Sequence, residues 1–241
     1  MSEETEKKPA FDLKDFEKLE KIGSGSFGKV FTIKEKSTGK IFAAKVSQYD
    51  FSDLSHSDQV DLVREININA KLTHPAIIRF IGFSPVDFKG QNNIVITTDY
   101  IKNGSLLKYI QLDAKSQSPP GWDFTKKLII AYGVAVGMSY LHLHNIIHRD
   151  LKADNILIDD NFHPKITDFG LSKSCDSNTL TQSGLKCTPA YAAPEVLIND
   201  EYTKAGDVYS YAMLLYELFT KKRPFSDISY IQFLLSAEKG T

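Results

Sequence analysis

The sequence predicts an α+β fold with two lobes, a smaller one built mainly of strands followed by a larger one built mainly of helices. Runs of β-branched and apolar residues, separated by turn residues, fill residues 22–97. Helical patterns with longer apolar periodicity fill residues 105–144 and 207–219. Because strands and helices are segregated along the chain instead of alternating, an α+β arrangement is favoured.

The composition fits a folded enzyme or binding domain. A chain of 241 residues with 42% apolar residues can bury a sizeable core, and a net charge of −1 gives no general attraction to nucleic acid or anionic membranes. No apolar run is long enough to span a bilayer. Cys175 and Cys187 are too few for a disulfide framework. We therefore expect reduced thiols and a cytoplasmic protein, with a nuclear location as the alternative.

The first elements surround a glycine-rich loop. Residues 1–10 are polar, and we expect a disordered tail that is neither a signal nor a transit peptide. The motif from Gly23 to Gly28 is followed by strands over 30–33 and 41–46. A dinucleotide-binding motif would be followed by a helix, so the strands after these glycines disfavour it. An ordinary hairpin would also explain this pattern.

The remaining elements follow from periodicity and capping. We expect strands over 77–81 and 94–97 and helices over 58–72, 105–112, 123–144 and 207–219. Asp123 can cap the long helix. The last helix is apolar on nearly every face, which is typical of a helix buried at the centre of a lobe.

A charged loop over residues 148–155 lies between two β-branched runs, so we expect buried strands at its ends and polar groups at a cleft. Asp150, Lys152 and Asn155 combine a carboxylate that can accept a proton, a cation, and an amide oxygen suited to a hard metal. Asp168 adds a second carboxylate of the kind that binds metals. Each charge alone could be a solvated surface group, but the set indicates phosphoryl-transfer chemistry.

This loop and the triplet after it resemble the catalytic and metal-binding motifs of eukaryotic protein kinases: His148-Arg149-Asp150-Leu151 with Asn155, then Asp168-Phe169-Gly170. The resemblance runs from about Phe16 to the last residue. It implies the two-lobed protein kinase fold, with the domain over 11–241, an N-lobe over about 11–98, a hinge over 99–104 and a C-lobe over 105–241. Relatives continue for several more helices, so we expect this C-lobe to be truncated.

The resemblance implies an ATP- and Mg²⁺-dependent serine/threonine kinase that transfers the γ-phosphoryl group to protein hydroxyls. In that case Asp150 orients the hydroxyl and accepts its proton, and Lys152 stabilises the γ-phosphate. Lys45, paired with Glu65, holds the α- and β-phosphates. His148 is expected to pack, and Asp207 to brace the backbone of the catalytic loop.

The implied cofactors are ATP and Mg²⁺. Asn155 and Asp168 would hold the metal. The implied nucleotide-binding residues come from the glycine-rich loop, the apolar sandwich around adenine and the hinge, and Lys45 is among them: Ile22, Gly23, Ser24, Gly25, Gly28, Val30, Ala43, Lys45, Thr98, Asp99, Ile101 and Leu157.

Serine/threonine specificity is implied by Lys152 and by Thr188, which would bond Asp150 and Lys152 as part of the substrate platform. Thr98 favours the tyrosine-kinase-like group of Ser/Thr kinases. The implied partners are protein substrates with Ser or Thr, and neither nucleic acid nor a membrane span is expected.

Arg149 implies that a phosphate on the activation segment orders this segment, added by an upstream kinase or by self-phosphorylation. The candidate sites are Thr179, Thr181 and Ser183, and an unmodified loop is the alternative.

Asn69 departs from the family pattern. Relatives have an apolar residue here that stacks with the positions of His148 and Phe169. A polar group would weaken this active arrangement unless its amide is satisfied, or else the helix is rotated and Asn69 is solvated. Together with the missing tail, Asn69 leaves a nucleotide-binding pseudokinase or scaffold as the alternative function.

Overall fold

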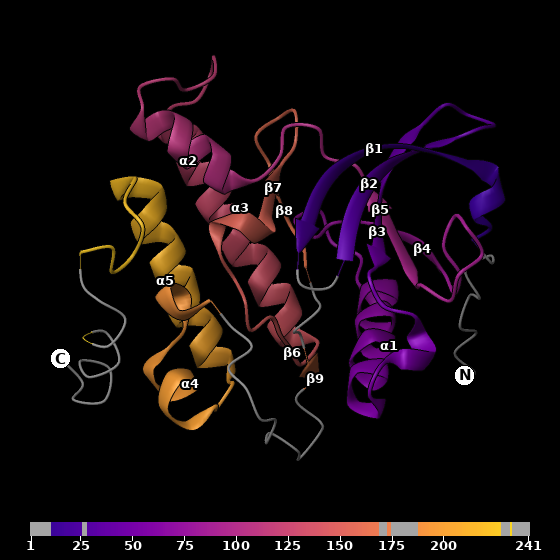
Figure 1. Ribbon diagram of the computed structural model, residues 1–241. Helices are drawn as coiled ribbons and strands as arrows, with labels where there is room; N and C mark the ends of the chain where they lie inside the picture. Colours follow the sequence, from indigo (N-terminus) through magenta and orange to yellow (C-terminus); the bar gives the residue numbers. More distant parts are fainter. Residues whose placement is uncertain (1–10, 26–27, 169–172, 175–187, 228–231, 233–241) are drawn as a thin grey trace, which may run out of the picture. The chain divides into compact units, whose positions relative to one another are not determined.

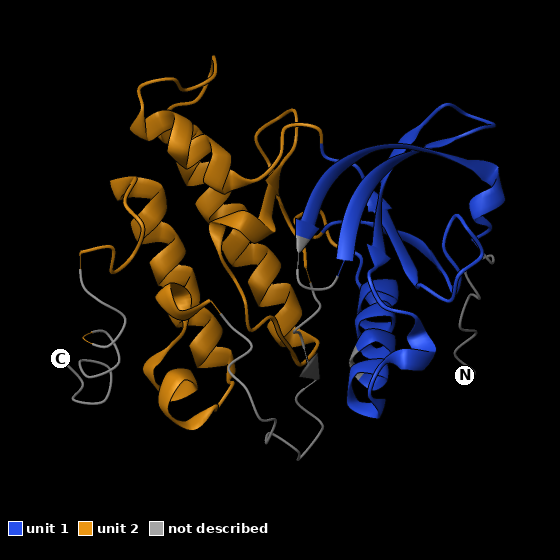
Figure 2. Cartoon of the chain, in the orientation of Figure 1, with its two compact units in different colours: residues 1–73, 78–101 blue, residues 74–77, 102–241 orange. Residues whose placement is uncertain are grey.

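The computed structural model describes residues 11–25, 28–168, 173–174, 188–227 and 232, and the chain divides into two compact units. The first unit comprises residues 1–73 and 78–101, and the second comprises residues 74–77 and 102–241 (Figure 2). Strands dominate the described part of the first unit and helices that of the second (Figure 1). The predicted α+β class, with a small β-rich part and a larger helical part, is therefore confirmed.

The first unit contains a five-stranded antiparallel sheet in the order β1-β2-β3-β5-β4. Its strands are β1 (Phe16–Gly25), β2 (Gly28–Glu35), β3 (Ile41–Ser47), β4 (Phe80–Ser84) and β5 (Val95–Asp99). The prediction of a strand from residue 77 is wrong, because Ile77 forms an isolated bridge with Ile166 within the second unit.

Strand β3 separates two environments in the first unit, because its side chains alternate between the two faces of the sheet. Lys45 lies on the face where helix α1 (His56–Lys71) packs through Ile66. The other face of β3 belongs to an apolar cluster made of Leu13, Phe16, Ile33, Phe42, Ala44, Val46 and Val95. Each face of the sheet thus carries an apolar cluster, and the face that packs against α1 also carries Lys45.

The second unit is built around α3 (Phe124–Leu143), which contacts α2 (Leu106–Ala114) and α5 (Lys204–Thr220). Asp123 caps α3 as predicted, since its Oδ1 accepts the N–H of Lys126 at 2.8 Å. Helix α4 (Pro194–Asn199) precedes α5. Gly137 allows α3 to approach strand β8 (Pro164–Ile166), because a Cβ there would lie 2.7 Å from Cδ1 of Ile166.

Two short strand pairs hold the charged loop. β6 (Ile146–Ile147) pairs with β9 (Lys173–Ser174), and β7 (Ile156–Ile158) pairs with β8. The isoleucines of β6 and the terminal isoleucines of β7 are buried. The loop over 148–155 therefore begins and ends in buried strands, as predicted.

Helix α5 differs from its prediction. Leu214 and Leu218 are fully buried, but Val208 and Tyr216 are 59% and 44% exposed. Burial on nearly every face is therefore wrong for the described structure, because neighbouring elements cover only part of the helix surface. Among the described helices, none has the length and hydrophobicity of a membrane-spanning segment.

Candidate functional site

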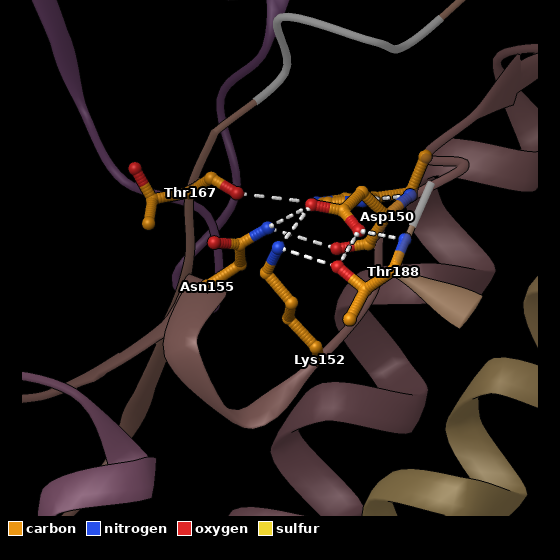
Figure 3. A network of polar contacts seen from close by, with 6 residues as sticks. Asp150, Lys152, Asn155, Thr167 and Thr188 are labelled. Carbon is orange, nitrogen blue, oxygen red and sulfur yellow. Dashed lines mark hydrogen bonds and ion pairs between the residues drawn. The ribbon is translucent and has the colours of Figure 1, made fainter. Parts of the chain in front are cut away.

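Three side chains converge on the carboxylate of Asp150 in the second unit (Figure 3). Nζ of Lys152 lies 2.6 Å from Oδ2, and Nδ2 of Asn155 lies 3.2 Å from the same oxygen. The hydroxyl of Thr188 donates to Oδ1 at 2.7 Å, and its N–H donates to Oδ1 at 3.1 Å. Nζ of Lys152 also donates to Oγ1 of Thr188 at 2.7 Å. The structure thus brings together the contacts predicted for Thr188.

This network determines what Asp150 can do chemically. Donors on both oxygens hold the carboxylate in one orientation, and an ionised carboxylate has about four acceptor positions. Lys152, Asn155 and the two donors of Thr188 occupy these positions, so an incoming hydroxyl must displace one of them to bind Asp150. Lys152 places a cation beside that position, where it can stabilise negative charge on a transferred group.

Asn155 is suited to bind a metal through its amide oxygen. The side chain is nearly buried, and Nδ2 donates to the backbone carbonyl of Asp150 at 2.8 Å as well as to the carboxylate. Because the amide nitrogen faces Asp150, the amide oxygen is directed elsewhere and can coordinate a hard cation.

Asp168 follows a segment that is bonded to Asn155, since the N–H of Thr167 donates to the backbone carbonyl of Asn155 at 2.9 Å. The φ angle of Asp168 is 65°, a left-handed value that is uncommon for a non-glycine residue and clusters at functional sites. In the described residues no group of three or more His, Cys, Asp or Glu side chains could hold a metal. One amide oxygen and one carboxylate nevertheless fit Mg²⁺, which commonly keeps water and phosphate oxygens as its other ligands.

Asp207 of α5 holds the main chain of the loop. Its Oδ2 accepts the N–H of His148 and its Oδ1 accepts the N–H of Arg149, both at 2.9 Å. Nε2 of His142 lies 2.8 Å from Oδ2. The φ angle of Arg149 is 72°, so Asp207 supports the loop where its backbone is strained. The bracing predicted for Asp207 is present.

His148 is fully buried and takes part in backbone contacts. Nε2 lies 3.1 Å from the carbonyl oxygen of Thr167, and Nδ1 lies 3.4 Å from the N–H of Asp150. A ring with Nε2–H donating and Nδ1 accepting satisfies both contacts. This placement agrees with the packing role predicted for His148.

A second carboxylate of α5 holds the segment after Thr188, and the sequence analysis missed it. The hydroxyl of Tyr191 donates to Oε2 of Glu217, and Oγ of Ser210 donates to the carbonyl of Tyr191 at 2.8 Å. Burial raises the pKa of Glu217, and burial together with Glu217 raises the pKa of Tyr191. An acid within an otherwise apolar helix was the signal that could have identified Glu217.

In the first unit, Nζ of Lys45 lies 3.0 Å from Oε1 of Glu65, so the predicted ion pair is present. Glu65 is 5% exposed, as is Asn69. Nδ2 of Asn69 donates to the backbone carbonyl of Glu65 at 2.8 Å. The alternative prediction of a solvated Asn69 is therefore wrong. The amide of Asn69 is hydrogen-bonded within α1, the helix that carries Glu65.

The sheet brings several of the predicted nucleotide-binding residues together. Val30 is paired with Lys45 and Ala43 with Thr98 across neighbouring strands, so all four lie on the face that carries α1. Their side chains are only partly buried. This face can therefore accept a flat apolar ligand beside the ion pair.

Gly28 has a structural requirement of its own. A Cβ at this residue would lie 2.0 Å from the carbonyl oxygen of Val46, because β2 approaches β3 closely. Strand β1 contains the other predicted residues of this region, which are Ile22, Gly23, Ser24 and Gly25. Glycine at position 28 is thus needed whether or not phosphates are bound.

The other predicted residues have separate positions. The N–H of Asp99 donates to the carbonyl of Arg79 at 3.0 Å, and its carboxylate binds the Arg79 guanidinium at 2.7 and 2.8 Å. Ile101 follows β5 and is partly buried, and Leu157 lies in β7 of the second unit. The candidate phosphorylation sites lie outside the described residues, as do two residues of the metal-binding triplet: Thr179, Thr181, Ser183, Phe169 and Gly170.

Comparison with known proteins agrees with this geometry. The sequence matches the protein kinase domain over residues 16–237. A RAC family serine/threonine-protein kinase homolog of Dictyostelium discoideum is 35% identical over 88% of this chain and 45% of its own length. The serine/threonine-protein kinase CTR1 of Arabidopsis thaliana is 37% identical over 88% of this chain and 25% of its own length.

Serine/threonine-protein kinase Sgk2 of Rattus norvegicus is 35% identical over 90% of this chain and 57% of its own length. The chain thus spans between a quarter and somewhat over half of these relatives. The match to the domain covers both units, including the Asp150 network and the Lys45–Glu65 pair. The chain belongs to the protein kinase domain family.

Proposed function

We propose that this chain is an ATP- and Mg²⁺-dependent serine/threonine protein kinase that transfers the γ-phosphoryl group to hydroxyls of protein substrates. The observation that carries the proposal is the carboxylate of Asp150, held by Lys152, Asn155 and Thr188. This set can bind a hydroxyl, accept its proton and stabilise the transferred group. The names of the relatives, all serine/threonine kinases in the three cases above, support the same specificity.

The catalytic roles are assigned to Asp150, Lys152, Lys45 and Glu65. Asp150 positions the acceptor hydroxyl and takes its proton, a contribution of about 10²–10⁴-fold in rate. Lys152 lies between Asp150 and Thr188, where it stabilises the γ-phosphate and orients the substrate platform. Lys45, held by Glu65, binds the α- and β-phosphates.

Other residues are assigned to the nucleotide and to the metal. Asn155 and Asp168 would hold Mg²⁺, which would neutralise charge on the phosphates when bound. In the first unit, adenine would lie against Ile22, Val30 and Ala43, with Thr98 beside it and the backbone of Asp99 and Ile101 as hydrogen-bonding partners. The phosphates are covered by the backbone of Gly23, Ser24, Gly25 and Gly28.

We assign the N-lobe to about 11–98, the hinge to 99–104 and the C-lobe to 105–241. Phosphorylation of Thr179, Thr181 or Ser183, by an upstream kinase or by the chain itself, would regulate activity through Arg149. The protein is assigned to the cytoplasm.

The test compares purified wild type with Asp150→Asn in transferring labelled phosphate from ATP and Mg²⁺ to a generic serine- and threonine-containing protein. Asp150→Asn should lower the rate about 10²–10⁴-fold. Asp53→Asn is the matched control, because it changes an exposed aspartate outside the network.

Equal transfer by wild type and Asp150→Asn would contradict the proposal. Phosphoamino-acid analysis of the product should give phosphoserine and phosphothreonine. Phosphotyrosine alone would contradict the proposed specificity, while leaving phosphoryl transfer intact.

A further inference from the structure

A groove in the second unit adjoins the Asp150 network. Its volume is about 820 Å³, and Lys152, Asn155 and Thr188 form part of its lining. Other parts of the lining come from α2 and from the end of α5 and the residues after it. A peptide whose hydroxyl reaches Asp150 would therefore extend along these helix ends.

Cations outnumber available anions around this groove. Lys115, Lys221 and Arg223 line it and are exposed. Within the described residues, neither Lys115 nor Arg223 forms an ion pair with a carboxylate. Arg223 acts on the buried carboxyl of Glu217 without forming an ion pair, and both cations can still bind a ligand.

Lys221 is only partly neutralised. Its Nζ lies 3.1 Å from Oδ1 of Asp113, but Oδ2 of the same carboxylate already binds Nζ of Lys127 at 2.6 Å. One carboxylate thus faces two lysines, and a positive charge remains. Because Asp113 is shared in this way, this side of the groove stays basic.

Two carboxyl groups of the lining oppose these cations to different degrees. Asp154 is exposed and carries its charge at the groove. Glu217 is 3% exposed and accepts the hydroxyl of Tyr191. Burial raises the pKa of Glu217, and the Tyr191 hydroxyl occupies Oε2, so this carboxyl is less accessible to a peptide than an exposed glutamate. Three exposed cations therefore face one exposed carboxylate.

We propose that this groove selects protein substrates in which aspartate or glutamate side chains flank the acceptor serine or threonine. Lys115 and Arg223 are the specificity-determining residues, and Lys221 supports them. The inference rests on the proposed kinase function, for which it names the class of substrate. Exposed charges of this kind each contribute modestly, so we expect a total preference of about fivefold to tenfold that weakens as salt is added.

The experiment uses three peptides with one serine, identical except that the flanking residues are acidic, neutral amides or lysines. kcat/KM should be about fivefold to tenfold higher for the acidic than for the neutral peptide, mainly through a lower KM. The double variant Lys115→Glu/Arg223→Glu should lose or reverse this order. Lys222→Glu makes the same charge change at a neighbouring exposed residue outside the lining, and should keep it.

A second measurement separates this proposal from the proposed function. The same three peptides with alanine in place of serine are titrated against the protein, and their Kd values are compared by fluorescence anisotropy. Tighter binding of the acidic peptide, lost in the double variant, supports the groove even if no phosphate is transferred. Tighter binding of the lysine peptide, or an acidic preference that survives the double substitution, would overturn it.

Discussion

Helix α5 carries one buried carboxyl group near each end, and the two support the candidate site in different ways. Asp207 in the first turn and Glu217 in the last turn are 2% and 3% exposed. Asp207 accepts two main-chain N–H groups and contacts His142. Glu217 accepts a single side-chain hydroxyl, that of Tyr191. One end thus holds backbone, and the other holds a side chain.

Because of this difference, the contacts of Asp207 do not depend on which side chains the loop carries, whereas the contact of Glu217 does. Main-chain N–H groups are present whatever the side chain, so Asp207 can hold residues 148–149 with any sequence there except proline. Glu217 depends on one hydroxyl, and Asp154 nearby disfavours its charged form. The end of α5 that supports residues 148–149 is therefore held by more hydrogen bonds than the end beside the proposed substrate groove.

The largest effect is expected from Asp207→Ala. The substitution leaves two main-chain N–H groups without their buried acceptor, and each loss costs about 1–3 kcal/mol. We expect the free energy of unfolding to fall by about 2–5 kcal/mol and kinase activity to be lost even where the variant is folded. Urea denaturation and the phosphate-transfer assay measure the two quantities.

Asp207→Asn is the matched variant, because its amide keeps one acceptor oxygen, and it should give an intermediate result. Wild-type activity in folded Asp207→Ala would show that the loop keeps its conformation without the hydrogen bonds to Asp207. The two ends of α5 would then differ in their contacts but not in their effect on activity.

A smaller effect is expected from Tyr191→Phe. The change removes the hydroxyl that donates to Glu217, and a buried acceptor that loses its partner costs about 1–3 kcal/mol. Because Tyr191 is connected to the Thr188 segment, KM for a peptide should rise more than kcat falls. Tyr132→Phe removes a hydroxyl from a side chain that is 73% exposed and serves as the control. Equal effects of the two substitutions would mean that the Tyr191 contact adds nothing.

The contrast between these ends also explains how far the sequence could be interpreted. Asp150, Lys152 and Asn155 lie within one short motif, so their convergence could be predicted without knowing the fold. The bond between Tyr191 and Glu217 joins residues 26 positions apart. No local pattern specifies such a contact, because it depends on how α5 packs against the preceding turn.

Periodicity had similar limits elsewhere. Strands β2 and β3 follow clear β-branched runs and were predicted, whereas residues 77–78 have the same composition but lie outside β4. For Asn69, a small rotation of α1 would decide between burial and solvation, so both remained open. The structure resolves the choice through burial and the bond to Glu65.

The smallest effect is expected from Glu217→Gln, and it depends on pH. Burial raises the pKa of Glu217 above its unfolded value of 4.5, so the native state binds this proton more tightly than the unfolded state does. The associated stability is fully present below the unfolded value and is lost as pH rises through the native pKa. Glutamine does not titrate, and its amide oxygen can still accept the Tyr191 hydroxyl.

The free energy of unfolding of Glu217→Gln, relative to wild type, should therefore increase between about pH 4 and about pH 8. The total change equals the free energy by which burial favours the protonated carboxyl, and urea denaturation across this range can measure it. Glu201→Gln, at an exposed glutamate, is the control and should give a flat difference. A flat or falling difference for Glu217→Gln would show that hydrogen bonds offset the burial of this carboxyl as fully as they do for Asp207. The carboxyl groups at the two ends of α5 would then be equally well stabilised.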